Sequence, residues 1–327
     1  MSVDESASES ARLSFSELPE AWTRLSRVRG LADVALVWAG IFAVVAFCGY
    51  LESGWIHLVG IVGIGILQNN ISSLAHHAIH SNIHPERRLN DGLTRLLLAA
   101  PLAQLFSVLR AEHLHHHAHL GATDDAERYY YDLTRHGRRE KGHLVRWVGG
   151  LFIGWVALGV ARRTLTGSRE GGEPPATRAL SERGKRERIL DLLAIPPMQI
   201  AVALAMWLAH GQWWAYLALW AIPAVTVGGG LTALRATLDH ADAGQPPDLD
   251  LSYVSNPLER FVVAPFNFNY HFEHHRFMTV PYYHVAKLRP LLQARGEFEG
   301  VQLLPGYVSR IRQLARELKA SPDNQAR

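Results

Sequence analysis

Four long apolar runs constrain the fold of this 327-residue chain more than any other sequence feature. They extend from Val34 to Leu51, Trp55 to Ala75, Leu192 to Ala209 and Trp213 to Leu234. A helix of about 20 apolar residues spans the hydrocarbon core of a bilayer. Only a few residues separate the runs within each pair, so each pair is expected to cross the membrane and return as a hairpin. The sequence therefore predicts an all-α integral membrane protein with four transmembrane helices in two hairpins.

Two further apolar runs, Leu93 to Leu109 and Leu144 to Val160, are shorter and are flanked or interrupted by Arg95, Pro101, Gln104, Arg110 and Arg146. We interpret them as interfacial helices that lie on the membrane surface. If the second run crossed the membrane, the basic linker from Arg162 to Arg188 would lie outside the cell, against the positive-inside tendency. We therefore expect both termini on the cytoplasmic side, with a cytoplasmic helical cap formed by residues 76–188 and 235–327.

The domain organisation follows from these spans. Residues 1–30 are polar and lack the apolar core of a signal peptide, so they are expected to form a cytoplasmic N-terminal surface segment. Residues 31–295 are expected to form the membrane domain. Residues 296–327 are expected to form a cytoplasmic helical tail.

Composition excludes several functions and draws attention to histidine. A formal charge of +3 with 19% charged residues is far from the dense basic composition of nucleic-acid-binding proteins, so no nucleic acid partner is expected. The single cysteine, Cys48, allows neither an internal disulfide nor a CxxC zinc pair. The chain has 18 histidines, and histidine is the commonest metal ligand among side chains.

Three histidine clusters have spacings that place several imidazoles on one helix face. The first is an HxxxH pair, and the other two are HxxHH: His76 and His80; His113, His116 and His117; His271, His274 and His275. Residues at i, i+3 and i+4 share a face, so each cluster can present nitrogens to one metal region. The spacing alone leaves the register open, because His80 with His84 and His115 with His119 also form HxxxH pairs. Imidazole ligands suit iron, zinc or copper.

Other histidines lie apart from these clusters in the sequence. We interpret them as ordinary polar residues: His57, His136, His143, His210 and His284.

The residues around the clusters resemble the histidine boxes of the membrane fatty acid desaturase family. His76 to His80 is followed by Arg87-Arg88-Leu89-Asn90-Asp91, and Arg110 opens a segment similar to RxxHxxHHxxxGxxxxD. The segment NYHFEHHRFMTVPYYHVAKL from Asn269 resembles the third box. The chain departs from the family pattern at three positions. His77 stands where an acidic residue often follows the first histidine of the box, Asp239 replaces the usual Glu, and Met278 replaces a common Pro. The resemblance covers about residues 35–295.

The resemblance implies a set of metal ligands. It selects His76 with His80 as the first pair and adds a lone histidine after the fourth span, in the segment from Arg235 to His240. The implied ligands of two iron ions are His76, His80, His113, His116, His117, His240, His271, His274 and His275. Acidic side chains expected to accept the other ring N–H groups of these ligands are Asp239, Glu273 and Asp125.

The resemblance also implies an activity, O2-dependent desaturation of an acyl chain or similar apolar lipid, in a bacterial cytoplasmic membrane with the metal site on its cytoplasmic side. The alternative within the family is a lipid or carotenoid-type hydroxylase or ketolase. Two other classes are a metal transporter, which would place ionisable ligands inside the spans, and an inactive lipid-binding homologue.

Electrons are expected from an external donor such as a ferredoxin, rubredoxin or cytochrome. The sequence has no haem-binding HPGG segment, no cysteine set for an iron–sulfur cluster and no Gly-rich dinucleotide fingerprint. Gly228-Gly229-Gly230 is interpreted as a site of close helix packing. The basic linker from Arg162 to Arg188 has two interpretations, a docking face for an acidic donor and a loop held to anionic lipid headgroups.

Overall fold

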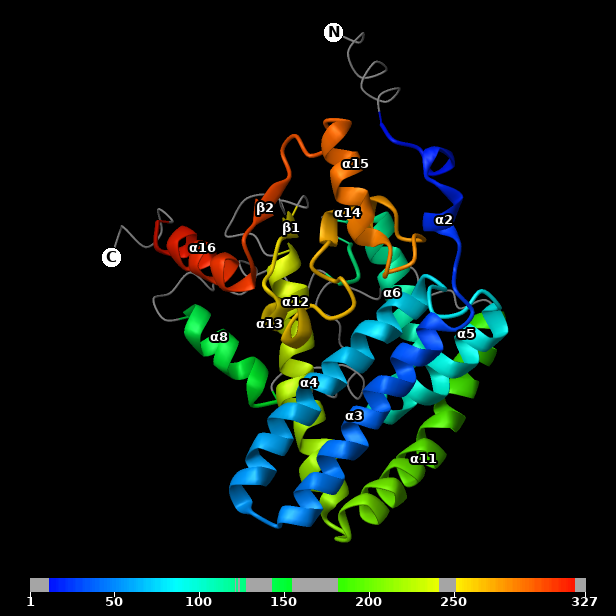
Figure 1. Ribbon diagram of the computed structural model, residues 1–327, viewed down its shortest axis with the longest axis vertical. Coiled ribbons are helices and arrows are strands. Elements are labelled where there is room, and N and C mark those ends of the chain that lie inside the picture. Colours follow the sequence, from blue (N-terminus) through cyan, green and yellow to red (C-terminus); the bar gives the residue numbers. More distant parts are fainter. Residues whose placement is uncertain are drawn as a thin grey trace, which may run out of the picture.

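The computed structural model describes residues 12–120, 122, 124–127, 143–154, 182–240 and 251–320. The described elements are mostly helices, with two short strands (Figure 1). The N-terminal half contains η1 (Phe15–Glu17), α2 (Glu20–Thr23), α3 (Arg29–Leu51), α4 (Gly54–Ile79), α5 (Arg87–Leu93), η2 (Thr94–Ala99), η3 (Ala100–Leu102), α6 (Phe106–Ala118) and α8 (His143–Phe152). The C-terminal half contains α11 (Glu182–His210), η4 (Leu217–Ala221), η5 (Ala224–Gly228), α12 (Gly229–His240), β1 (Leu251–Tyr253), α13 (Pro257–Val262), α14 (His271–Arg276), η6 (Val285–Lys287), α15 (Leu288–Ala294), β2 (Gln302–Leu304) and α16 (Tyr307–Ala320).

Within the described residues, four helical stretches are each long and apolar enough to cross a membrane, in agreement with the four predicted spans. They are Arg29–Leu51, Gly54–Ile79, Gly184–His210 and Leu217–His240. The fourth joins η4, η5 and α12, and both η segments are π-helical. The second and fourth spans continue past the ends of their apolar runs. The second span therefore includes His76 in its last turn, and the fourth span ends at His240.

The run from Leu93 to Leu109 does not form the single interfacial helix that the sequence predicted. Ala103 adopts a left-handed conformation with φ of 54°, and this turn separates η3 from α6. The helical segments on either side, Arg87–Leu102 and Phe106–Ala118, are bent by 99° relative to each other. The bend turns α6 toward the end of α4, and the two helices pack together.

The second predicted interfacial helix is described only in part. Helix α8 covers the beginning of the run from Leu144 to Val160, and residues 155–181, which include most of the basic linker from Arg162 to Arg188, lie outside the described residues.

Helix α4 packs against α3 and against the fourth span. The backbones of α4 and the fourth span approach each other closely. A Cβ atom on Gly65 would lie 2.4 Å from Cβ of Val227, and one on Gly228 would lie 3.0 Å from Cβ of Gln68. Only glycine leaves room for backbones this close. This crossing agrees with the interpretation of Gly228-Gly229-Gly230 as a site of close helix packing.

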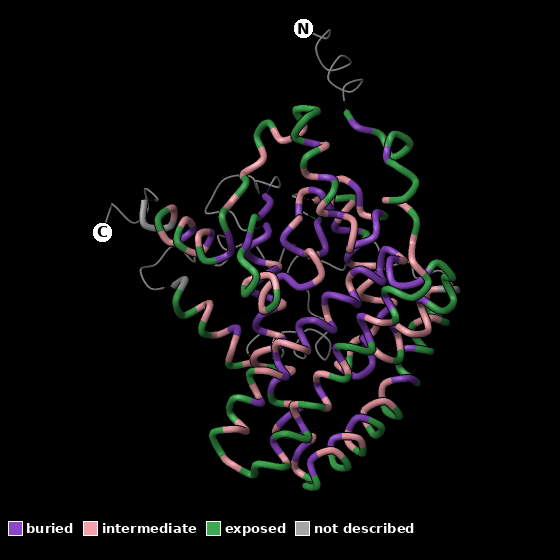
Figure 2. The backbone as a smooth tube through the Cα atoms, in the orientation of Figure 1, coloured by how far each residue is buried: buried purple, intermediate pink, exposed green. Residues whose placement is uncertain are grey.

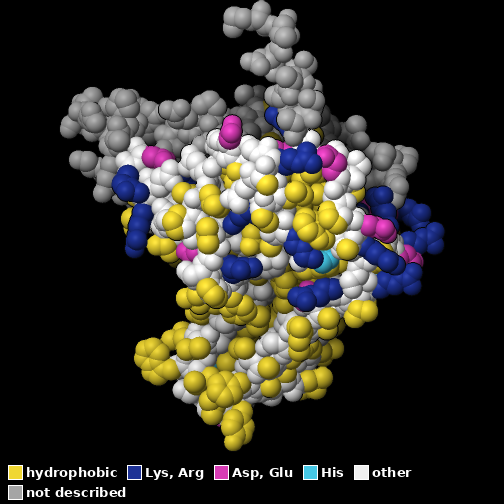
Figure 3. Space-filling model, turned by 45° about the horizontal axis from the view of Figure 1, so that its top comes forward, with side chains coloured by type: hydrophobic (Ala, Val, Ile, Leu, Met, Phe, Trp, Pro, Cys, Tyr) yellow, Lys and Arg dark blue, Asp and Glu magenta, His cyan; other side chains and the backbone are white. Residues whose placement is uncertain are grey.

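The lower end of the molecule in Figure 1, where α3 meets α4 and where α11 ends, presents a largely apolar surface. Figure 2 shows exposed residues along the outer faces of these helices, and Figure 3 shows apolar side chains gathered over this end. Trp55 and Trp213 are each about four-fifths exposed, at 79% and 80%. A large exposed apolar surface of this kind indicates contact with lipid. Charged side chains lie over the other half of the face in Figure 3.

A small parallel sheet of β1 and β2 supports the third histidine segment. The Asn269 side-chain amide donates a hydrogen bond to the carbonyl oxygen of Tyr253 in β1, at 3.0 Å. The backbone N–H of Tyr253 in turn donates to the carbonyl oxygen of Asn269, at 2.9 Å. These reciprocal bonds fix the start of α14 against the strand.

Candidate metal centre

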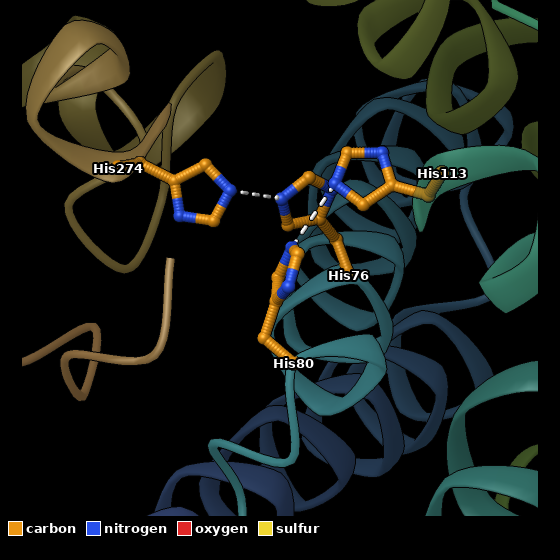
Figure 4. A group of neighbouring side chains, drawn as sticks. All are labelled: His76, His80, His113 and His274. Carbon is orange, nitrogen blue, oxygen red and sulfur yellow. Dashed lines mark hydrogen bonds between the residues drawn. The ribbon is translucent and has the colours of Figure 1, made fainter. Parts of the chain in front are cut away.

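Side chains from α4, α6 and α14 meet above the spans and form what we term the first histidine group (Figure 4). It consists of His76, His80, His113 and His274, one nitrogen of each lying within 4.8 Å of the others. His76 and His80 project from the end of α4, His113 from α6 and His274 from α14. Three elements far apart in the sequence therefore supply one cluster of imidazoles.

A second histidine group lies beside the first and consists of His116, His240 and His275. His117 lies between the groups. Its Nε2 is 2.9 Å from Nε2 of His113, and its ring centroid is 4.3 Å from that of His275. His271 lies next to the second group, with its ring centroid 4.4 Å from that of His240 and 4.5 Å from that of His275.

All nine histidines selected by the resemblance are therefore brought together. They come from four elements, because α12 supplies His240.

The distances between nitrogens test whether metal ions fit these groups. Nε2 of His76 is 3.1 Å from Nε2 of His274, and Nε2 of His113 is 3.1 Å from Nε2 of His80. Imidazole nitrogens bound to one transition-metal ion at about 2.1 Å lie roughly 3.0 to 3.4 Å apart, depending on the coordination angle. Both spacings belong to the first histidine group and match one site with several nitrogen ligands, and the nitrogens of the second group lie within 4.8 Å of one another.

The protonation of these rings also suits metal binding. Burial, reinforced by the positive charge that neighbouring imidazoles would carry, lowers the pKa of His80, His113, His274 and His275 well below the usual value. The rings are therefore neutral near neutral pH, and each offers a nitrogen lone pair. Metal ligation requires this form of histidine.

Carboxylates in the turn after α6 hold two of the rings. Nδ1 of His116 lies 2.9 Å from Oδ2 of Asp125, and Nδ1 of His113 lies 2.9 Å from Oε1 of Glu127. A carboxylate partner makes Nδ1 the protonated nitrogen and leaves Nε2 as the ligand atom. Burial opposes the charged form of His116, but Glu127 and Asp125 raise its pKa above the usual value.

The other two acidic residues expected from the resemblance have different surroundings. Asp239 is buried, with Oδ2 3.8 Å from Nδ1 of His271, and accepts a 3.1 Å hydrogen bond from the Tyr307 hydroxyl. Glu273 is fully buried, accepts a 2.6 Å hydrogen bond from Ser252 and pairs with Arg289. These contacts join α14 to β1 and α15.

Sequence reasoning missed Glu127, Tyr307 and one histidine pair. Glu127 follows Asp125 by two residues, and this spacing is the only signal that marks it in the sequence. Nothing local marks Tyr307, since it reaches Asp239 from the start of α16. The sequence did not indicate that His57 and His210 form a pair: their Nε2 atoms lie 2.9 Å apart, because the start of α4 and the end of α11 meet at the apolar end of the molecule.

Comparison with known proteins places the converging histidines within a family match. The family model described as fatty acid desaturase matches residues 53–305. The chain is also similar to a beta-carotene ketolase from a Paracoccus species, with 24% identity over 240 residues that cover 71% of this chain and 78% of the relative. The matched range holds all nine converging histidines and three of the four spans in full. The chain therefore belongs to the fatty acid desaturase family.

Proposed function

We propose that this chain catalyses the O2-dependent oxidation of an unactivated C–H bond in an acyl chain or similar apolar lipid. The observation that carries the proposal is the pair of adjacent histidine groups at the ends of membrane helices, in a member of the fatty acid desaturase family. His76 and His240 lie at the ends of two of these helices, so we expect a substrate dissolved in the bilayer to approach the groups from the membrane.

The nine histidines are proposed to hold two iron ions, which when bound would supply the chemistry of O2 reduction and C–H oxidation. The residues of the chain hold the ligands in place. Asp125 and Glu127 fix the tautomers of His116 and His113. The reciprocal bonds of Asn269 with Tyr253 fix the start of α14, from which three of the histidines project.

Two reactions are candidates for this site. Desaturation of an acyl chain is the reaction named by the family model. Introduction of oxygen into a carotenoid-like substrate is favoured by the similarity to a beta-carotene ketolase. The two outcomes differ in how the substrate is held relative to the oxidising centre rather than in the ligand set.

Product analysis separates these candidates. Membranes containing the chain and a reducing system would be supplied with isotopically labelled fatty acids or with a carotenoid, and the products identified by mass spectrometry. Loss of two hydrogen atoms indicates desaturation, and gain of oxygen indicates hydroxylation or ketolation. The variant His240→Ala should give no product, and His284→Ala should behave like the wild type. Product formation by His240→Ala at the wild-type rate would contradict the ligand assignment.

The orientation in the membrane is a further part of the proposal. We propose that α3 with α4, and α11 with the fourth span, form two hairpins, and that the histidine end faces the cytoplasm. In support, the connections at the other end, Glu52 to Ser53 and Gly211 to Tyr216, contain no Lys or Arg, as the positive-inside tendency requires of external loops. A ferredoxin, rubredoxin or cytochrome donor would then bind the cytoplasmic cap.

A further inference from the structure

A third group of potential ligands lies at the end of α6 and shares no residue with the two histidine groups. It consists of His115, His119 and Asp124, with one ligand atom of each lying within 4.8 Å of the others. The two histidines are one helical turn apart. Their rings stack with centroids 4.0 Å apart and planes inclined by 11°. Asp124 reaches them from the turn that follows the helix.

His115 is buried without a hydrogen-bond partner among the described residues. Only 8% of its surface is exposed, and neither ring nitrogen has a partner there. A buried polar group without a partner destabilises the folded protein. A cation bound to one of these nitrogens would supply the missing partner.

His119 is already oriented for such a role. It lies on the surface, and its Nδ1 is 3.1 Å from the backbone carbonyl oxygen of His115. Because a carbonyl oxygen can only accept, Nδ1 carries the proton and Nε2 carries the lone pair. A backbone carbonyl bound to the other ring nitrogen is a common way of fixing a histidine ligand.

We infer that His115, His119 and Asp124 form a third metal site, which binds a divalent transition-metal ion such as Zn2+. Two imidazoles and one carboxylate are a ligand set that zinc accepts, with water in the remaining position. Calcium and magnesium prefer sites made of oxygen ligands, so the two nitrogens disfavour them. The exposed Asp124 gives an ion access from solvent.

The site would tie α6 to the turn that carries Asp125 and Glu127. Hydrogen bonds already shape this turn: the N–H of Ala122 donates to the carbonyl oxygen of His119 at 2.9 Å, and the N–H of Glu127 donates to Oδ1 of Asp125 at 2.9 Å. An ion held by residues on both sides of the turn would restrain it further. The third site is therefore structural, and it stabilises the carboxylates that hold His116 and His113.

Zinc binding tests the inference directly. The purified, iron-loaded protein would be dialysed against buffered solutions of Zn2+, and its zinc and iron contents measured by elemental analysis. The wild type should take up about one additional zinc per chain with no loss of iron. Asp124→Asn and His119→Gln should each weaken this uptake by at least about tenfold. Both positions are exposed, so both variants should fold, and Glu299→Gln, which changes an exposed carboxylate elsewhere, serves as the matched control.

Two results would overturn the inference. Equal zinc uptake by the wild type and Asp124→Asn would show that Asp124 is not a ligand. Zinc that enters only as iron leaves would show that it occupies the two histidine groups instead. The comparison between wild type and variants does not depend on which metal fills those groups, so the outcome is independent of the proposed oxidation reaction.

Discussion

At the scale of single residues, the carboxylates after α6 determine how the metal-facing rings are held. Glu127 and Asp125 each lie 2.9 Å from Nδ1 of a histidine, at His113 and His116 respectively. The resemblance predicted Asp125, and its contact with His116 agrees with the role expected of it. Glu127 was not predicted, because its contact depends on how the turn folds back against α6 and no sequence spacing encodes that path.

The variant Glu127→Gln should weaken iron binding by about 10- to 100-fold, because the amide keeps the shape but loses the charge that orients His113. Asp125→Asn should have an effect of similar size through His116. Iron content after dialysis against a graded series of chelator concentrations measures both. Glu299→Gln is the control, and unchanged iron retention in Glu127→Gln would show that the carboxylate does not orient its ligand.

At the scale of elements, the crossing of α4 with the fourth span fixes the relative positions of His76 and His240. The helices approach most closely at Gly65, where an added Cβ would lie 2.4 Å from Cβ of Val227. The apolar runs predicted both spans. They did not predict this contact, because the pairing of helices depends on side-chain packing between segments about 160 residues apart in sequence.

The variant Gly65→Ala should therefore destabilise the protein by roughly 1 to 3 kcal/mol, the usual cost of overpacking. It should also reduce iron content, since α4 and α12 must move apart. Gly63→Ala in the same helix is the matched control, because its Cβ would meet no atom within 4 Å. Thermal unfolding in detergent compares the two. A melting temperature for Gly65→Ala equal to that of Gly63→Ala would contradict the close crossing.

The ends of elements were harder to predict than their existence. Pro101 and Gln104 interrupt the apolar run from Leu93 to Leu109, but we did not predict from them the 99° bend between Arg87–Leu102 and Phe106–Ala118. The bend follows Ala103, whose left-handed conformation is rare for a residue other than glycine, so the alanine itself does not indicate it. The resemblance selected His113, His116 and His117 of α6, and the structure brings all three among the other selected histidines. Only the bend explains how this helix reaches the end of α4.

At the scale of the whole molecule, the two histidine groups join α4, α6, α12 and α14, so bound metal should stabilise the entire fold. A ligand that binds only the folded state raises stability by RT ln(1 + L/Kd), where L is the free ligand concentration, so the gain grows as that concentration exceeds Kd. Removing iron with a membrane-compatible chelator should therefore lower the melting temperature by several degrees, and restoring iron should reverse the change. Differential scanning calorimetry of the same preparation before and after chelation measures the effect. Equal melting temperatures would show that metal does not link these elements.

The contribution of α14 to both histidine groups also sets an order of events during biosynthesis. One group includes His274 and the other His275, and both residues follow the fourth span in the chain. Neither group is complete until the ribosome has passed residue 275 of 327 and the last span has been inserted. The proposed metal loading would thus be a late step of maturation, because a nascent chain stalled before α14 lacks the histidines that complete either group.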